Sequence, residues 1–289
     1  MVQPITSERL TPGQRKQLRR LVEDATDSVC VELTKKRAQR LIGRGGELKA
    51  GILGLARIFS LGQFADEEVV SSYEYPQTYQ PRPVPEQVEI LRQLLPELAE
   101  ATFDESILTR DLPGGAEAYF AVPRWEKLGQ SYGEALERIL AAIGSSRTFC
   151  NYRKGCLGSA YLRQSARTAE LFQRLSEQQA GYDILVVSCQ FGLSHRGRSV
   201  RRALELMEES EAGLSAFAVA CMLLTHPERL ATGQELWIDC AGDEYSDGGD
   251  GRFGRAPCFG FSMCELGFGA SYVGYAGGRY GSASVLLPQ

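Results

Sequence analysis

A short apolar segment at residues 183–188 (DILVVS) ends in an arginine-rich turn, and this segment most restricts how the chain can fold. Short apolar runs bounded by turn residues are typical of buried strands, and residues 198–209 have a helical pattern. A strand, a turn and a helix in succession indicate an α/β or α+β protein. Such a turn also directs backbone N–H groups and the positive end of a helix dipole toward one place, where an anion can bind.

Capping signals predict helices near the start of the chain. Thr11, Pro12 and Gln14 have the arrangement of a capping box with proline at the first helical position. Thr34 is placed to cap a second helix, and residues 47–59 carry apolar side chains at helical spacing, which predicts a third. The first part of the chain is therefore expected to be mostly helical.

Farther along, helical and strand patterns alternate. We expect buried strands at residues 118–122, 183–188 and 235–241, and helices at residues 85–100, 133–143, 159–179 and 198–209. After residue 240 the helical pattern ends, and glycines interleaved with Phe and Tyr favour short strands and tight turns. The whole pattern predicts a larger α/β body with a Gly/aromatic-rich C-terminal part.

Residues 71–85 (SSYEYPQTYQPRPVP) have a different composition from the rest of the chain. Their prolines favour an extended course, and their three tyrosines indicate a segment that packs against the body. We therefore expect a basic helical head at 1–70, a Pro/Tyr-rich linker at 71–85 and an α/β body at 86–289.

The formal net charge of −4 is unevenly distributed. Residues 1–57 contain twelve Lys and Arg against six Asp and Glu, a net of +6, which leaves −10 for the rest. A basic head favours a surface for phosphates. The alternative is that these Lys and Arg only solvate the outer faces of amphipathic helices.

Composition excludes several classes of protein. The longest apolar run is much shorter than the roughly 20 residues that span a bilayer, and the N-terminus lacks the pattern of a signal peptide. Eight cysteines in 289 residues are too sparse for a disulfide scaffold, so we expect reduced thiols. These features favour a cytoplasmic protein without a membrane partner.

The turn after residue 188 contains the candidate phosphate ligands Arg196, Arg198, Ser199, Arg201 and Arg202. With Cys189 and His195 it partly resembles the phosphate-binding loop of cysteine-dependent phosphatases, which implies a cysteine nucleophile. In that family an arginine follows the cysteine after five residues, whereas here His195 has that position. A catalytic Cys189 and His195, a non-covalent anion site, and a structural turn with its arginines paired to carboxylates all remain open.

A second candidate is the glycine-rich sequence between the second and third expected helices. Gly43, Arg44, Gly45 and Gly46 resemble the GxxG loop of KH domains, which implies binding of single-stranded nucleic acid. A glycine-capped turn between two helices is the structural alternative. Residues 152–167 mix cations with tyrosines, which suits nucleic acid equally well, and their candidate contacts are Arg153, Lys154 and Arg163.

Acidic residues cluster in the sequence WIDCAGDEYSDGGDG. Asp239, Asp243, Asp247 and Asp250 are candidate oxygen ligands for Mg²⁺ or Ca²⁺. Their spacing does not match an EF-hand, and a solvated acidic turn is the alternative.

From these patterns we expect a protein that binds a phosphate-rich ligand, most plausibly nucleic acid, through the basic head and the arginine turn. A phosphoester-cleaving or phosphoryl-transfer enzyme using Cys189 or a carboxylate-bound metal is the second hypothesis. A structural or assembly protein that forms homo-oligomers is the third. The sequence does not decide whether the chain is an enzyme.

Overall fold

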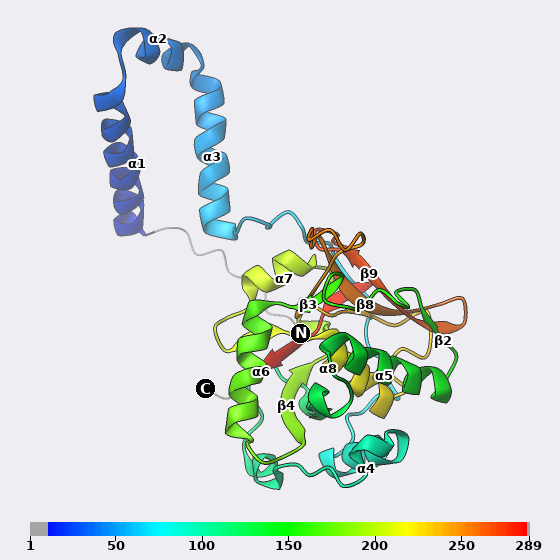
Figure 1. Cartoon of the computed structure of the whole chain (residues 1–289). Helices are drawn as coiled ribbons and strands as arrows, with labels where there is room; N and C mark the ends of the chain where they lie inside the picture. Colours follow the sequence, from blue (N-terminus) through cyan, green and yellow to red (C-terminus); the bar gives the residue numbers. More distant parts are fainter. Residues whose placement is uncertain (1–10, 288–289) are drawn as a thin grey trace. The chain divides into compact units, whose positions relative to one another are not determined.

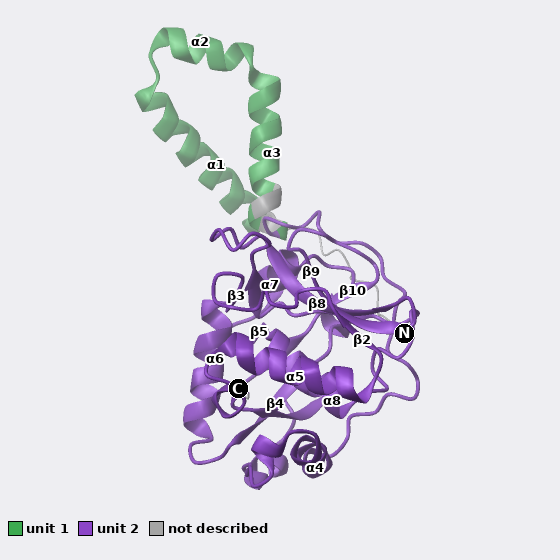
Figure 2. Cartoon of the chain, turned by 45° about the vertical axis from the view of Figure 1, so that its right-hand side comes forward, with its two compact units in different colours: residues 1–61 green, residues 62–289 purple. Residues whose placement is uncertain are grey.

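The computed structural model describes residues 11–287, and the chain divides into two compact units, residues 1–61 and 62–289 (Figure 2). The first unit contains the helices α1 (Pro12–Glu32), α2 (Lys35–Gly43) and α3 (Gly45–Leu61). The second unit contains the remaining helices and all the described strands.

The helix starts in the first unit follow the predicted caps. Thr11 and Gln14 form a capping box, in which the Gln14 N–H donates to Thr11 Oγ1 at 3.2 Å and the Thr11 N–H donates to Gln14 Oε1 at 2.9 Å. Thr34 caps α2 by accepting from the Arg37 N–H at 3.4 Å. Within the described part of this unit no residue is buried, so these helices lack a hydrophobic core.

The helices of the second unit are α4 (Val84–Leu94), α5 (Tyr132–Ser146), α6 (Ala166–Gln178), α7 (Val200–Leu206) and α8 (Ala216–Thr225). Short 3-10 turns lie at Pro96–Leu98, Glu105–Thr109, Trp125–Lys127 and Leu193–His195. The strands are β1 (Ala118–Pro123), β2 (Phe149–Asn151), β3 (Leu162–Gln164), β4 (Ile184–Gln190), β5 (Glu211–Gly213), β6 (Trp237–Asp239), β7 (Asp243–Tyr245), β8 (Arg255–Ser262), β9 (Glu265–Tyr272), β10 (Tyr280–Ser282) and β11 (Ser284–Leu286).

These strands form two sheets. The first is antiparallel with the order β1-β4-β11-β5, and every residue of β4 is buried in it. The second has the order β10-β6-β8-β7-β3, with β9 paired to β8 and β2 paired to β9. The helices α5 and α8 lie near each other in the body (Figure 1), and every residue of α8 is buried. An all-apolar helix is expected only where it is covered on every side.

The segment that follows α3 runs along the body. Backbone pairs join Glu68 to Arg198 and Glu74 to Glu235, and Tyr79 is buried in the hydrophobic core. Arg82 donates its backbone N–H to His226 Nε2 at 3.0 Å. The tyrosines of this Pro/Tyr-rich segment therefore pack as their composition suggested.

The mixed α/β class is confirmed, with a helical N-terminal region followed by a sheet-rich body. One expected helix differs, because residues 162–164 of the predicted helix 159–179 form the strand β3, which pairs with β7. Among residues 11–287, no helix combines the length and the apolar character that crossing a membrane requires.

Candidate functional site

The turn between β4 and α7 begins at a position that only glycine adopts readily. Gly192 has φ = +122°, and a Cβ added there would lie 2.7 Å from the carbonyl oxygen of Gly281. A 3-10 turn follows, and Ser199 then caps α7 by accepting from the Arg202 N–H at 3.1 Å. The sequence thus folds locally as the strand, turn and helix that it predicts.

Each of the four arginines of this turn faces a carboxylate of the chain. Arg201 Nε lies 2.9 and 2.7 Å from the two carboxylate oxygens of Glu67. The remaining pairs join Arg202 to Glu68 at 2.5 Å and to Glu205 at 2.9 Å, Arg198 to Glu68 at 3.6 Å, and Arg196 to Glu74 at 3.4 Å. Each of these arginines therefore has at least one carboxylate partner within the chain.

Glu67 occupies the place where a phosphate was expected. Its Oε2 accepts a hydrogen bond from Ser199 Oγ at 2.6 Å, beside the contacts with Arg201. The hydrogen bond from Arg201 holds the pKa of Glu67 below its ordinary value, so the carboxylate is charged at neutral pH. The negative group that this turn holds is the chain's own, and the geometry favours the structural alternative for the arginines.

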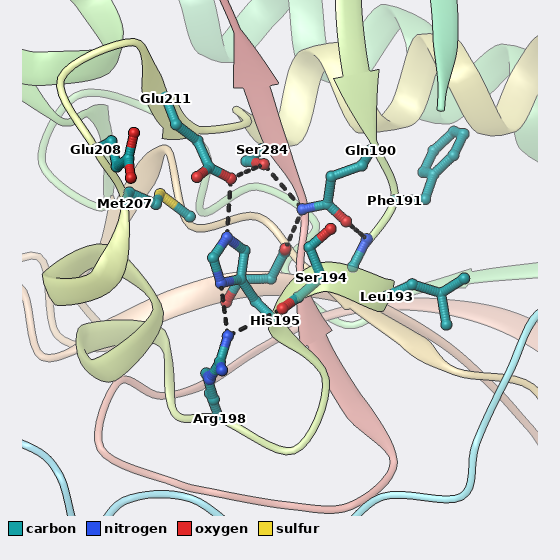
Figure 3. Close-up of polar contacts among 12 residues, drawn as sticks. Gln190, Phe191, Leu193, Ser194, His195, Arg198, Met207, Glu208, Glu211 and Ser284 are labelled. Carbon is teal, nitrogen blue, oxygen red and sulfur yellow. Dashed lines mark hydrogen bonds and ion pairs between the residues drawn. The ribbon is translucent and has the colours of Figure 1, made fainter. Parts of the chain in front are cut away.

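His195 belongs to a buried polar network rather than to an open cleft (Figure 3). Its Nε2 lies 2.8 Å from Glu211 Oε1, which also accepts from Ser284 Oγ. Its Nδ1 lies 3.3 Å from Arg198 Nη1. Since a guanidinium only donates, Nδ1 accepts and the Nε2 proton points to Glu211. Although burial alone would raise the pKa of Glu211, the hydrogen bonds from His195 and Ser284 outweigh it and leave the pKa lowered.

Cys189 lies in the middle of the first sheet. It pairs with Ala118 of β1 and Val285 of β11, and its side chain is fully buried. Burial raises the pKa of the thiol well above its ordinary value, and Glu117 raises it further. The neighbouring Gln190, not Cys189, contacts the His195 network, since its Nε2 donates to Ser284 Oγ at 2.9 Å. These contacts give no support to a nucleophilic thiolate.

The four candidate metal ligands have separate environments. Asp247 pairs with Arg153 and Arg255, and Asp250 pairs with Arg252. Asp239 and Asp243 are buried. Within residues 11–287, no three His, Cys, Asp or Glu side chains gather as metal ligands. The structure thus gives no support to a Mg²⁺ or Ca²⁺ site here.

The glycine-rich candidate for nucleic-acid binding forms the junction between α2 and α3. Gly43 and Gly45 mark the end of α2 and the start of α3, with Gly46 in the first turn of α3, and Arg44 pairs with Glu47. The described residues of this unit form helices, without the strands that a KH domain needs around its GxxG loop.

In the second unit most of the predicted basic track is paired. Arg153 lies 3.1 Å from Asp247, and Arg163 lies 2.6 Å from Glu244 while its guanidinium stacks 3.9 Å from the centroid of the Phe253 ring. Lys154 is exposed. Because Arg153 and Arg163 already face carboxylates, the structure gives no support to an open cationic track here.

A pocket with a volume of about 240 Å³ was missed at the level of sequence. Its lining mixes polar and apolar side chains, Ser215 among them, and includes four aromatic residues: Trp125, Tyr132, Phe172 and Phe217. Tyr132 donates its hydroxyl to Asp243 Oδ2 at 2.6 Å, and the Ala216 N–H donates to the same oxygen at 2.8 Å.

The aromatic residues of this pocket come from four separate elements, so no local sequence motif predicts the pocket. Asp243, which the sequence offered only as a metal ligand, is buried in the structure, and a buried carboxyl needs a partner. The partner, Tyr132, lies 111 residues away in the chain.

Comparison with protein-family models, with curated proteins and with solved structures gives no match for this chain. Its function is therefore inferred from its own residues and contacts.

Proposed function

We propose that the chain binds nucleic acid through the cationic faces of α1 and α2. The main support is that two groups of cations differ in whether they form ion pairs. The arginines of the turn after β4 all face carboxylates, whereas Lys35, Lys36, Arg37 and Arg40 of α2 are exposed and form no ion pair with any described residue. Exposed, unpaired cations are the groups that can neutralise phosphates.

The position of these cations within α2 supports the same proposal. Lys35, Lys36 and Arg37 occupy the first turn, and that turn contains no acidic residue. A cation near a helix N-terminus faces the positive end of the dipole, which costs about 0.3–1 kcal/mol per charge. Helix stability therefore does not explain these residues, and a polyanion lying across them would offset their cost.

The first half of α1 extends the cationic surface. Arg15, Lys16, Arg19 and Arg20 are all exposed, and their one ion pair with a residue in the range 11–287 joins Arg20 to Asp24 at 3.9 Å. Since an exposed pair of this length contributes little, these side chains are available to phosphates within a single chain.

Titration of labelled single-stranded RNA and DNA with the full chain tests the proposal. We expect the variant Lys35→Gln/Lys36→Gln/Arg37→Gln/Arg40→Gln to bind at least tenfold more weakly than the native chain in about 50 mM salt. Each phosphate contact adds about 0.7 to the salt slope for single strands, so the variant should lose up to about 3 units of slope.

The matched control removes paired cations from the second unit. Arg196→Gln/Arg198→Gln should leave affinity within about twofold, because both guanidinium groups already donate to backbone carbonyls, of Tyr73 and Ser194, besides facing carboxylates. Circular dichroism shows whether the helices persist in both variants. Absence of binding by the native chain at low salt, or equal affinity of the native chain and the α2 variant, overturns the proposal.

A further inference from the structure

The helix α1 exposes a row of apolar side chains. Every described side chain of this helix is exposed, including Leu18, Val22 and Val29, which have 51%, 49% and 49% of their surface accessible. An amphipathic helix gains stability mainly by covering its apolar face. The row on α1 lacks such a cover.

The row has the spacing of a coiled-coil seam. Leu18, Val22, Ala25 and Val29 follow one another at intervals of four, three and four residues. This spacing is the same from either end, with its midpoint between Glu23 and Asp24. A second copy of α1 running in the opposite direction would place Leu18 against the partner's Val29 and Val22 against the partner's Ala25.

The charges along α1, like the apolar spacing, suit a second copy of the helix in the antiparallel orientation. The first half contains the cations Arg15, Lys16, Arg19 and Arg20, and the second half contains the acids Glu23, Asp24, Asp27 and Glu32. An antiparallel copy sets each basic half beside the partner's acidic half and places Arg15 opposite the partner's Glu32. A parallel copy sets like charges together, which is unfavourable.

From the seam and the charges together, we propose that α1 pairs with α1 of a second copy in antiparallel orientation. Such an interface is isologous, because the same surface of each copy contacts the other. The pairing covers the exposed row without requiring any other protein. It goes beyond the proposed function, since it rests on the apolar row and the charge halves of α1. In the paired state the α1 cations face the partner's acids, and the unpaired cations of α2 remain the phosphate contacts.

Light scattering or sedimentation of the full chain measures the first consequence. We expect a dimer for the native chain and a monomer for Val22→Glu, which puts a charge into the seam. Because Val22 is exposed, this substitution removes no buried contact within the chain. Gln17→Glu, which adds the same charge outside the seam, should remain dimeric. A monomeric native chain overturns the proposal; this result is expected if α3 of the same chain covers the row. A Val22→Glu dimer with the stability of the native dimer also overturns it.

Disulfide trapping tests the orientation. In a background where the exposed cysteines are replaced (Cys30→Ser, Cys264→Ser), chains with Leu18→Cys and chains with Val29→Cys are mixed and oxidised. Antiparallel pairing predicts a cross-link in the mixture and none in the Leu18→Cys chains alone. There the two cysteines would be offset by eleven residues, about 16 Å along the axis, well beyond the roughly 7 Å limit for a disulfide. A cross-link in the Leu18→Cys chains alone indicates parallel pairing and overturns the proposal, as does the absence of any cross-link. Neither result depends on nucleic acid, so this inference and the proposed function can fail separately.

Discussion

Glu67 is the anion that the arginine turn binds in the structure. Sequence reasoning placed an anion at this turn and left open whether it belonged to a ligand or to the chain. The deciding contact joins Arg201 to a carboxylate 134 residues earlier. Such a pair leaves no local pattern in the sequence, which is why the cluster of arginines could be found while its partner could not.

Removing the charge of Glu67 should weaken its contacts with Arg201 and Ser199. We expect Glu67→Gln to lower the free energy of unfolding by about 1 kcal/mol, because the pair is partly exposed and loses a charged acceptor for Ser199 and Arg201. Urea unfolding at pH 7 measures it. Glu74→Gln is the control, since the pair with Arg196 is long and exposed, and should stay within about 0.5 kcal/mol of the native chain. Equal losses in the two variants contradict the account.

A second prediction at the residue scale concerns the buried carboxyl of Asp243. Burial raises the pKa of Asp243 from 3.8 to about 7 in the folded chain. The folded state then binds more protons at Asp243 than the unfolded state between those two values, so the contribution of Asp243 to stability is full below pH 3.8 and is lost as pH rises to about 7. The shift corresponds to roughly 4 kcal/mol.

Asp243→Asn should remove this contribution. The stability of the variant relative to the native chain should rise between about pH 4 and pH 7 and then level off, as measured by chemical unfolding across that range. Asp250→Asn, at an exposed position, serves as the control and should show no such rise above pH 5, because its pairing with Arg252 lowers the pKa. A constant difference between Asp243→Asn and the native chain would show that this carboxyl does not titrate as described.

At the scale of elements, the helix caps followed from signals within a few residues, whereas the pairing of strands far apart in the chain left no such signal. The caps at Thr11 and Thr34 fix two helix starts because their hydrogen bonds reach only three residues ahead. The strand β3 was predicted as helix, since its three residues carry no alternating pattern and become a strand by pairing with β7. Tertiary contacts override local propensity in such short strands.

The helix α5 offers an element-scale test within one helix. Gly133 packs against another segment, and an added Cβ would lie 1.9 Å from the carbonyl oxygen of Leu157, whereas at Gly144 the nearest atom is 3.5 Å away. Gly133→Ala should therefore lose about 2–3 kcal/mol of stability. Gly144→Ala should be neutral or gain up to about 1 kcal/mol. Thermal unfolding compares them, and a Gly133→Ala chain as stable as Gly144→Ala would refute the close packing at Leu157.

At the scale of the whole molecule, the class of fold followed from the alternation of helical and strand patterns, but the sheet order did not. The strand β11 lies between β4 and β5, although it is the last strand described. That position depends on pairing across about one hundred residues. The uneven charge was visible in the sequence, and the structure adds which cations are paired. That difference assigns the proposed nucleic-acid contact to α2 and not to the turn after β4.

Photo-crosslinking measures this assignment most directly. An oligonucleotide carrying thiouridine in RNA, or thiothymidine in DNA, is bound to the full chain and irradiated, and the labelled peptides are identified by mass spectrometry. We expect label on peptides from residues 12–49, which contain the exposed cations of α1 and α2. Label confined to residues 152–167 or 196–202, or no label at low salt, would contradict the central claim.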